Sequence, residues 1–239
     1  MDSYIEKIGK YSVSYFNKIE FRNLKKEIFK DEIYNLDINI GKDKATRVNI
    51  IDVGAYIGLS ILYFKSRFPN AHIIAFEPNP NVFPLLQENI EYNNIKNVQL
   101  HNIAIGKKSE RRKLYIETSG FMAFSTASFR KDAWNGKQKS RPIIVQTEPL
   151  SKYIDKKVDI LKIDVEGAEH EILKELDESK GFSKIENLLI EYHPSKNGKL
   201  QNLEKILRRN GYTISYRKDG EGLENGVEEL ILIVAKKTV

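Results

Sequence analysis

The 239-residue sequence contains no cysteine and only four histidines, and both shortages limit the catalytic and metal sites that the chain can form. Without cysteine the chain forms no disulfide, no Cys-ligated zinc site and no thiol nucleophile. The four histidines are scattered along the chain, which argues against a His-rich metal site; they are His72, His101, His170 and His193. No apolar run approaches the roughly 20 residues of a membrane-spanning helix. The first residues carry charge and lack the apolar core of a signal peptide, so we expect a cytoplasmic protein without a membrane span.

The charged residues are unevenly distributed along the chain. Hydrophobic residues make up 41% and charged residues 30%, which is typical of a soluble globular protein with a full core. Between Lys107 and Arg141 there are ten basic residues and three acidic ones, whereas the rest holds 29 basic and 30 acidic residues. The formal charge of +6 therefore belongs to one segment and not to the whole surface.

Apolar spacing from residue 48 onward alternates between strand-like and helix-like patterns. It predicts strands at 48–53, 72–77, 98–105, 158–165 and 187–192, and helices that begin after Gly58, at an N-cap Asn81, near Ala168 and near Leu200. Two consecutive strands, 212–216 and 229–235, close the chain. Because parallel strands need helical crossovers, we expect an α/β protein with a doubly wound, mostly parallel sheet and an antiparallel C-terminal hairpin at one edge.

Two segments stand outside this alternation. Residues 1–47 have spacing that predicts a mainly helical cap, either with a role of its own or as a cover for the core. Residues 107–146 carry two short strand-like runs around a polar, basic and aromatic stretch. This basic segment lies between the third and fourth strands, so it could act as a lid. The basic segment could recognise an anionic or sugar-bearing acceptor, with its aromatic side chains stacking on the sugar ring. Alternatively, it is a solvated loop.

Ligands of open α/β sheets bind at the carboxyl ends of strands, so the residues there are the first candidates. The first strand ends in Asp52-Val-Gly-Ala-Tyr-Ile-Gly58, where glycines allow a sharp turn and close approach of a ligand. Glu77 ends the second strand and could accept both hydroxyls of a ribose, or be a solvated carboxylate. Asn102 and Ala104, near the third strand end, would suit an adenine edge.

Five motifs in order along residues 48–237 resemble the FkbM-type S-adenosylmethionine-dependent methyltransferases. They are Asp52–Gly58, Phe76-Glu-Pro-Asn-Pro80, Asn102-Ile-Ala-Ile-Gly106, Leu161-Lys-Ile-Asp-Val-Glu-Gly-Ala-Glu169 and Glu191-Tyr-His193. The fourth motif is the most specific. Tyr56 departs from the pattern, because the family usually has Asn there, and residues 1–47 lie outside the resemblance.

The resemblance implies a class I (Rossmann-like) methyltransferase fold with a seven-stranded, mostly parallel sheet across residues 48–239, binding S-adenosylmethionine. By family position, the loop from Asp52 to Gly58 would hold the methionine part, Glu77 the ribose, and Asn102 with Ala104 the adenine. Asp164 would lie near the amino group or the sulfonium. The implied cofactor-binding residues are Asp52, Gly54, Ala55, Tyr56, Gly58, Glu77, Asn79, Asn102, Ala104 and Asp164.

Methylation of a hydroxyl needs a base, and four residues at or after the fourth and fifth strands are candidates: Asp164, Glu166, Glu191 and His193. Asp164 could instead bind only the cofactor, and Glu166, like Glu169, could serve only the start of a helix. His72, His101 and His170 are interpreted as structural. Asp164, Glu191 and His193 could also hold Mg²⁺, although the sequence does not establish a metal.

The sequence is compatible with three classes of function. A small-molecule O-methyltransferase acting on a sugar, glycan or secondary metabolite agrees best with the resemblance. An RNA (tRNA) methyltransferase would use the basic and aromatic residues of the basic segment as its nucleic-acid surface, but that segment is short and no RNA-binding module accompanies it. A non-catalytic or NAD-binding α/β domain is the third class. The sequence names neither the acceptor nor the oligomeric state.

Overall fold

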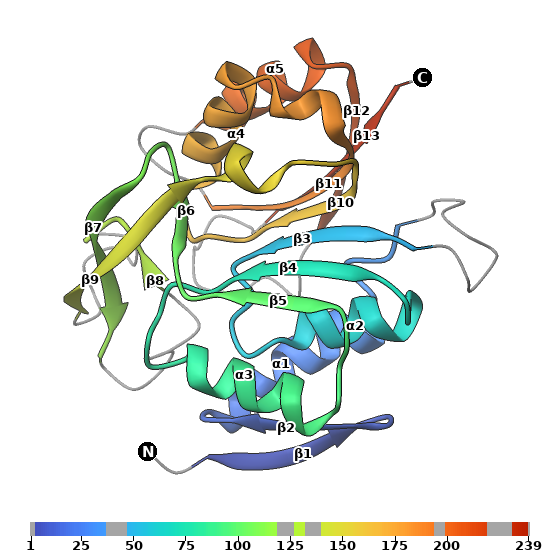
Figure 1. Ribbon diagram of the computed structural model, residues 1–239, viewed down its shortest axis with the longest axis vertical. Coiled ribbons are helices and arrows are strands. Elements are labelled where there is room, and N and C mark those ends of the chain that lie inside the picture. Colours follow the sequence, from blue (N-terminus) through green and yellow to red (C-terminus); the bar gives the residue numbers. More distant parts are fainter. Residues whose placement is uncertain are drawn as a thin grey trace.

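A seven-stranded sheet forms the centre of the protein, in the order β12-β13-β11-β10-β3-β4-β5 (Figure 1). The structure is a computed structural model that describes residues 3–36, 47–118, 127–131, 140–193, 199–218 and 231–238. The strands are β3 (Asn49–Val53), β4 (His72–Phe76), β5 (Val98–His101), β10 (Val158–Ile163), β11 (Ile185–Tyr192), β12 (Tyr212–Lys218) and β13 (Ile231–Lys237). Strands β5, β4, β3, β10 and β11 pair in parallel, and β13 runs antiparallel to both of its neighbours. The predicted doubly wound sheet with its C-terminal hairpin is confirmed.

Helices cover both faces of this sheet. They are α2 (Leu59–Arg67), α3 (Phe83–Tyr92), α4 (Glu169–Glu178) and α5 (Leu200–Arg209), with short 3₁₀ turns at Leu150–Tyr153 and Gly181–Lys184. Figure 1 shows α4 and α5 on one face and α2 and α3 on the other. The expected cap at Asn81 is wrong, because α3 begins after Val82 without a side-chain cap. Asn79 instead accepts a hydrogen bond from the Asn81 backbone N–H at 3.0 Å.

The N-terminal segment begins with a β-hairpin, formed by β1 (Tyr4–Ile8) and β2 (Tyr11–Tyr15). The expectation of a mainly helical segment is therefore wrong for residues 4–15. In β2 the alternate residues Tyr11, Val13 and Tyr15 are all buried, which is the period of a strand. Helix follows at α1 (Lys18–Lys25) and a π-helical turn (Lys26–Lys30). Residues 37–46 lie outside the described part, and a domain boundary at 47 remains a prediction.

Two asparagines hold this hairpin, Asn89 of α3 and Asn93 just after the helix. Asn89 is buried, and its side chain accepts a hydrogen bond from the Ser14 N–H at 2.7 Å. Its amide donates to the carbonyls of Ser14 at 3.0 Å and Ile57 at 2.9 Å. Asn93 bonds in the same way to the N–H and carbonyl of Ser12. The hairpin and helix α3 thus share polar contacts as well as one apolar core.

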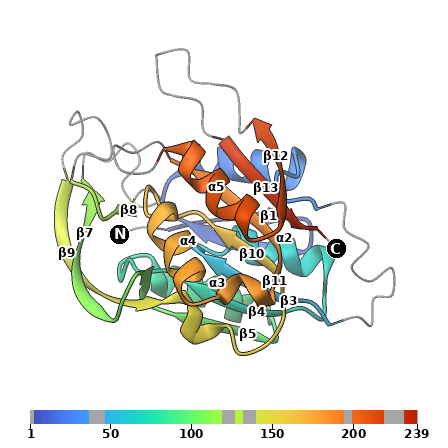
Figure 2. The same cartoon turned by 90° about the horizontal axis from the view of Figure 1, so that it is seen from above.

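A second sheet stands beside the carboxyl ends of the central strands (Figures 1 and 2). It has the order β6-β9-β7-β8, with β6 (Ala104–Gly106), β7 (Glu110–Glu117), β8 (Ala127–Ser128) and β9 (Ser140–Pro149). The predicted third strand, 98–105, is thus two strands in two different sheets. The chain leaves the central sheet at Asn102, whose side chain donates to the Glu77 carbonyl at 2.8 Å. Across the residues that the structure describes, no helix has the length and apolar character needed to cross a membrane.

Replacing Asn89 tests whether the hairpin is held by this contact. Asn89→Ala removes three buried hydrogen bonds and leaves the Ser14 and Ile57 backbone groups unpaired, so we expect a loss of about 2–4 kcal/mol in the free energy of unfolding by urea titration. Glu91→Ala, at an exposed position of the same helix, is the control. Equal stability of the two variants would contradict the assigned role of Asn89.

Candidate functional site

The strands β3 and β10 are in close backbone contact where both end. Gly54 has a φ of +85°, and a Cβ atom there would lie 1.8 Å from the carbonyl oxygen of Asp164. The Asp164 N–H donates to the Val53 carbonyl at 3.0 Å, while the N–H groups of Gly54 and Ala55 donate to Phe76 of β4, each at 3.0 Å. Only glycine therefore fits at position 54. The backbone contacts join the ends of β3, β4 and β10.

A buried lysine lies at this junction, and the sequence reasoning missed it. The ammonium of Lys162 donates to the Gly54 carbonyl at 2.7 Å and lies 3.2 Å from the Asp52 carboxylate and 3.4 Å from that of Asp164. Lys162 is 2% exposed. Burial alone would lower its pKa, but the carboxylates of Asp52, Asp164 and Glu191 raise the pKa of Lys162 above its ordinary value. A lysine in the run Ile160-Leu-Lys-Ile163, whose other residues are apolar and buried, was the signal that could have identified it.

Asp52, predicted to contact the cofactor, lies fully buried behind the loop. The Ser60 hydroxyl donates to one of its carboxylate oxygens at 2.5 Å, and Lys162 lies beside the other. Burial raises the pKa of Asp52, while the neighbouring Lys162 ammonium opposes that shift. The structure thus directs Asp52 toward Lys162, and a direct contact with a cofactor remains a prediction.

Glu77 follows β4 and is surrounded by polar groups of two loops. Its carboxylate accepts hydrogen bonds from the N–H groups of Tyr56 at 3.0 Å and Asn79 at 2.8 Å. Burial raises the pKa of Glu77 to about 7. The buried Asn79 amide nitrogen has no hydrogen-bond partner within the described residues. A carboxylate and an unpaired amide at one strand end fit the hydroxyls and polar edge of a nucleoside.

Tyr56 connects this loop to the N-terminal helix α1. Its backbone φ is +47°, a left-handed conformation that is uncommon for a tyrosine. Its hydroxyl donates to the Glu20 carboxylate of α1 at 2.7 Å. No sequence signal pointed to Glu20, which lies outside the resemblance and 36 positions from Tyr56. Gly58 ends the loop, and a Cβ there would lie 2.8 Å from Leu86.

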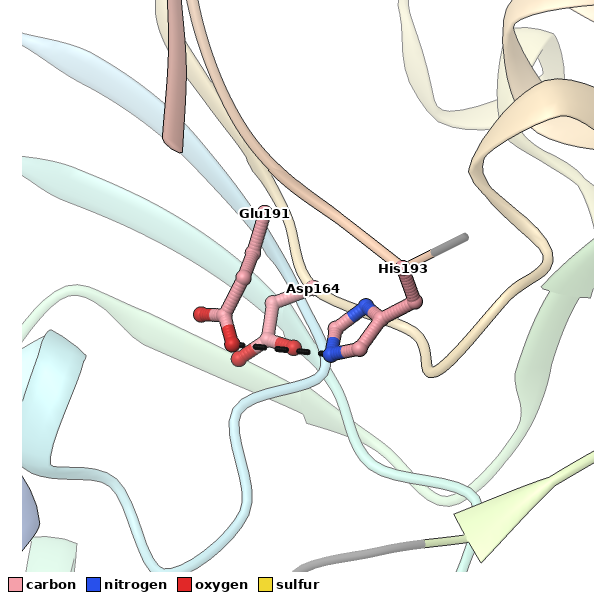
Figure 3. A group of neighbouring side chains, drawn as sticks. All are labelled: Asp164, Glu191 and His193. Atoms are coloured by element: carbon pink, nitrogen blue, oxygen red, sulfur yellow. Dashed lines mark ion pairs between the residues drawn. The ribbon is translucent and has the colours of Figure 1, made fainter. Parts of the chain in front are cut away.

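Four predicted base candidates gather at the ends of β10 and β11. Figure 3 shows Asp164, Glu191 and His193 pointing toward one another. The Nε2 atom of His193 lies 3.5 Å from a carboxylate oxygen of Glu166 and 3.5 Å from one of Glu191. On the other side of the ring, Nδ1 lies 2.8 Å from the buried carboxylate of Glu169, which fixes its orientation. Burial opposes protonation, yet the carboxylates of Glu166, Glu169 and Glu191 raise the pKa of His193 well above its ordinary value.

Glu166 sits on a strained turn that the second sheet supports. Its φ is +54°, and the Ser128 hydroxyl of β8 donates to its carbonyl at 2.7 Å. The next residue, Gly167, is covered by the Arg130 side chain, 3.6 Å from where a Cβ would be. Burial raises the pKa of Glu166 to about 7, although His193 lowers it. Strain of this kind persists where surrounding contacts enforce it and is concentrated at functional sites.

A divalent cation could also be held here. Asp164, Glu191 and His193 each offer one ligand atom, and these atoms lie within 4.8 Å of one another. Two carboxylates and an imidazole are suitable ligands for Mg²⁺ or Mn²⁺. Lys162 already lies 3.4 Å from Asp164, so part of the negative charge at this position is balanced by the chain itself.

The other predicted residues lie away from this cluster. Ala104 is buried with Leu114 and Val145 in the core of the second sheet, so its place beside an adenine remains a prediction. Three side chains of the basic segment form ion pairs: Lys107 with Glu178 at 3.2 Å, Lys108 with Glu110 at 3.2 Å, and Arg112 with Glu171 at 2.6 Å. Phe121, Phe124, Trp134, Lys137 and Lys139 fall outside the described residues.

Comparisons with known proteins show which family this chain is similar to. Residues 52–214 match the methyltransferase FkbM domain family. The chain is 30% identical over 244 aligned residues to methyltransferase sdnD of Sordaria araneosa, with 88% of each chain covered. It is 22% identical over 234 residues to the 31-O-demethyl-FK506 methyltransferase FkbM of Streptomyces tacrolimicus, covering 87% of this chain and 88% of that protein.

A solved structure shows the same fold. The methyltransferase FkbM from Methylobacillus flagellatus superposes with a TM-score of 0.54 at 20% identity, covering 81% of this chain and 46% of that one. Together with the strand order, this match confirms the class I fold that the resemblance implied.

The raised pKa of Glu77 predicts a particular dependence of stability on pH. Its pKa rises from 4.5 to about 7 on folding, so the folded state binds the proton more tightly. The contribution of Glu77 to the free energy of unfolding is therefore complete below pH 4.5 and is lost as the pH rises to about 7. We expect wild type to lose of the order of 3 kcal/mol more than Glu77→Gln across this window in urea titrations at stepped pH. If the free energies of unfolding of wild type and Glu77→Gln changed with pH in parallel, this prediction would be wrong. The control Glu91→Gln should behave as wild type.

Proposed function

Because the chain belongs to the FkbM family of methyltransferases, we propose that it transfers the methyl group of S-adenosylmethionine to a hydroxyl of a sugar, glycan or secondary metabolite. The name of one relative, a 31-O-demethyl-FK506 methyltransferase, supports transfer to oxygen on a small molecule. The observation that carries the proposal is the cluster at the strand ends. Polar groups around Glu77 that suit a nucleoside follow β4, and a group of carboxylates surrounds His193 at the ends of β10 and β11.

The residues for the donor divide into two groups. Glu77 would accept the ribose hydroxyls, and the free Asn79 amide would donate to a polar atom of the nucleoside. The Gly54–Gly58 loop and Asp164 would hold the methionine part at the junction of β3 and β10. When bound, S-adenosylmethionine supplies an electrophilic methyl carbon. The chain's task is then to orient an acceptor oxygen in line with it.

Glu166 is the residue we propose as the base. Its raised pKa of about 7 lies near the working pH, where a carboxylate is both ionised and basic enough to accept a hydroxyl proton. The imidazolium of His193 at 3.5 Å would keep it ionised and oriented. The acceptor oxygen loses its proton to Glu166 and gains the methyl group, while S-adenosylhomocysteine leaves.

The other three candidates have competing contacts. Asp164 is paired with Lys162, and His193 is held protonated by its three carboxylate neighbours. Glu191 lies 3.5 Å from His193, as Glu166 does, and we prefer Glu166 because burial raises its pKa to about 7. They are therefore proposed as orienting groups. Asp164 would face the donor, whereas Glu191 and His193 would line the acceptor space.

The charge around the acceptor space favours a hydroxylated small molecule over a nucleic acid. Carboxylates dominate the ends of β10 and β11, and they would repel a phosphate backbone. Three basic side chains of the basic segment are already paired with acids of the chain. Steep salt dependence of tRNA binding would support the RNA alternative instead.

Removing the base should abolish most of the turnover. We expect Glu166→Gln to lower kcat by about 10²- to 10⁴-fold and to remove the acidic limb of the pH–rate profile near pH 7. The measurement is S-adenosylhomocysteine release with an acceptor found in a panel of hydroxylated small molecules. Glu178→Gln, which removes an exposed carboxylate of α4, is the control. A Glu166→Gln enzyme with wild-type kcat would rule out this base.

We further propose that the cation of the acceptor space is the His193 imidazolium and not a divalent metal ion. Its three neighbouring carboxylates supply the contacts that hold it charged. Dialysis against EDTA should therefore leave kcat and donor affinity unchanged. If EDTA abolished turnover and Mg²⁺ restored it, the alternative in which Asp164, Glu191 and His193 hold the metal would be supported.

A further inference from the structure

We propose that Lys162 is the positioning residue of the donor site, holding the Asp164 carboxylate and the Gly54 carbonyl in the places where they meet the amino-acid part of S-adenosylmethionine. The inference rests on the proposed function, because it takes S-adenosylmethionine as the donor. It assigns a role to a residue that binds neither donor nor acceptor itself.

The side chain of Lys162 crosses from one strand to the next. Lys162 of β10 pairs directly with Asp52 of β3 in the parallel register. Residues two apart in a strand lie on the same face, so Asp164, just past β10, follows on the side of Lys162. The ammonium therefore meets Asp52, Asp164 and the Gly54 carbonyl at 3.2, 3.4 and 2.7 Å. On another side it lies 5.7 Å from the centre of the Tyr34 ring.

The exposure of the three charged groups shows how the contact can act on a ligand. The side chains of Asp52 and Lys162 are 0% and 3% exposed, whereas that of Asp164 is 25% exposed. Lys162 thus connects a fully buried carboxylate to one at the rim of the site. If Lys162 served only to stabilise the sheet, its contact with Asp52 would be sufficient, and it would not have to contact Asp164 as well.

This connection has a consequence for one part of the donor. The amino-acid part carries an ammonium group, and a fixed carboxylate at Asp164 is the natural partner for it. The adenosine part would bind around Glu77 instead, through contacts that do not involve Lys162. Loss of Lys162 should therefore weaken ligands that contain the amino-acid part more than ligands that lack it.

The test compares two ligands on one variant. Lys162→Met combined with Asp52→Asn removes the cation and its buried partner together, so the local net charge is unchanged. S-adenosylhomocysteine contains the amino-acid part, and 5′-methylthioadenosine lacks it. By calorimetric titration we expect the double variant to bind S-adenosylhomocysteine about tenfold more weakly and 5′-methylthioadenosine about as tightly as wild type.

Controls separate this role from a general effect on folding. Lys65→Met removes another buried lysine, which donates to the carbonyls of Ala71 at 2.5 Å and Lys96 at 2.6 Å, and should leave both affinities unchanged. Asp52→Asn alone keeps the lysine, and the double variant should weaken S-adenosylhomocysteine further than this single variant does. If the double variant does not fold, Lys162→Gln with Asp52→Asn should show the same split. Equal weakening of both ligands, or of neither, would overturn the proposal. Wild type that binds neither ligand would instead refute the proposed function, and this inference with it.

Discussion

The ammonium of Lys162 between β3 and β10 is the interaction on which the site depends. It lies where the strand order changes direction, and it bonds to the carbonyl of Gly54 while facing two carboxylates. The same junction needs a glycine, because any Cβ at position 54 would collide with the Asp164 carbonyl. Close backbone approach and a shared buried cation together hold the carboxyl ends of the two strands, where open α/β sheets bind their ligands.

Much of this arrangement follows from the sequence, because parallel strands bring their carboxyl ends to one edge. The strand pattern places Glu77 at this edge, and the motifs that resemble the FkbM family add Asp164 and His193 to the same site. The hairpin at 4–15 could not be predicted in this way, because the apolar spacing of residues 1–47 fits a mainly helical segment. Lys162 and Glu20 were missed because their partners are distant in sequence or lie in the interior, and apolar periodicity carries no information on such polar contacts.

The structure also changes the interpretation of charge. The sequence predicts that the basic segment lies near the donor site. The structure shows that the ends of β10 and β11 are rich in carboxylates. Three of the basic side chains are used in ion pairs, and Arg130 covers Gly167. The second sheet thus contributes to the site chiefly by supporting the strained turn at Glu166, through Ser128.

A crystal structure of the protein with S-adenosylhomocysteine tests the central claim most directly. The account predicts that the ribose hydroxyls bond to Glu77 and that the amino-acid part lies against the Gly54–Gly58 loop with its ammonium at Asp164. The sulfur should then face the space lined by Glu166 and His193. A ligand bound elsewhere, or with its amino-acid part away from Asp164, would contradict the account.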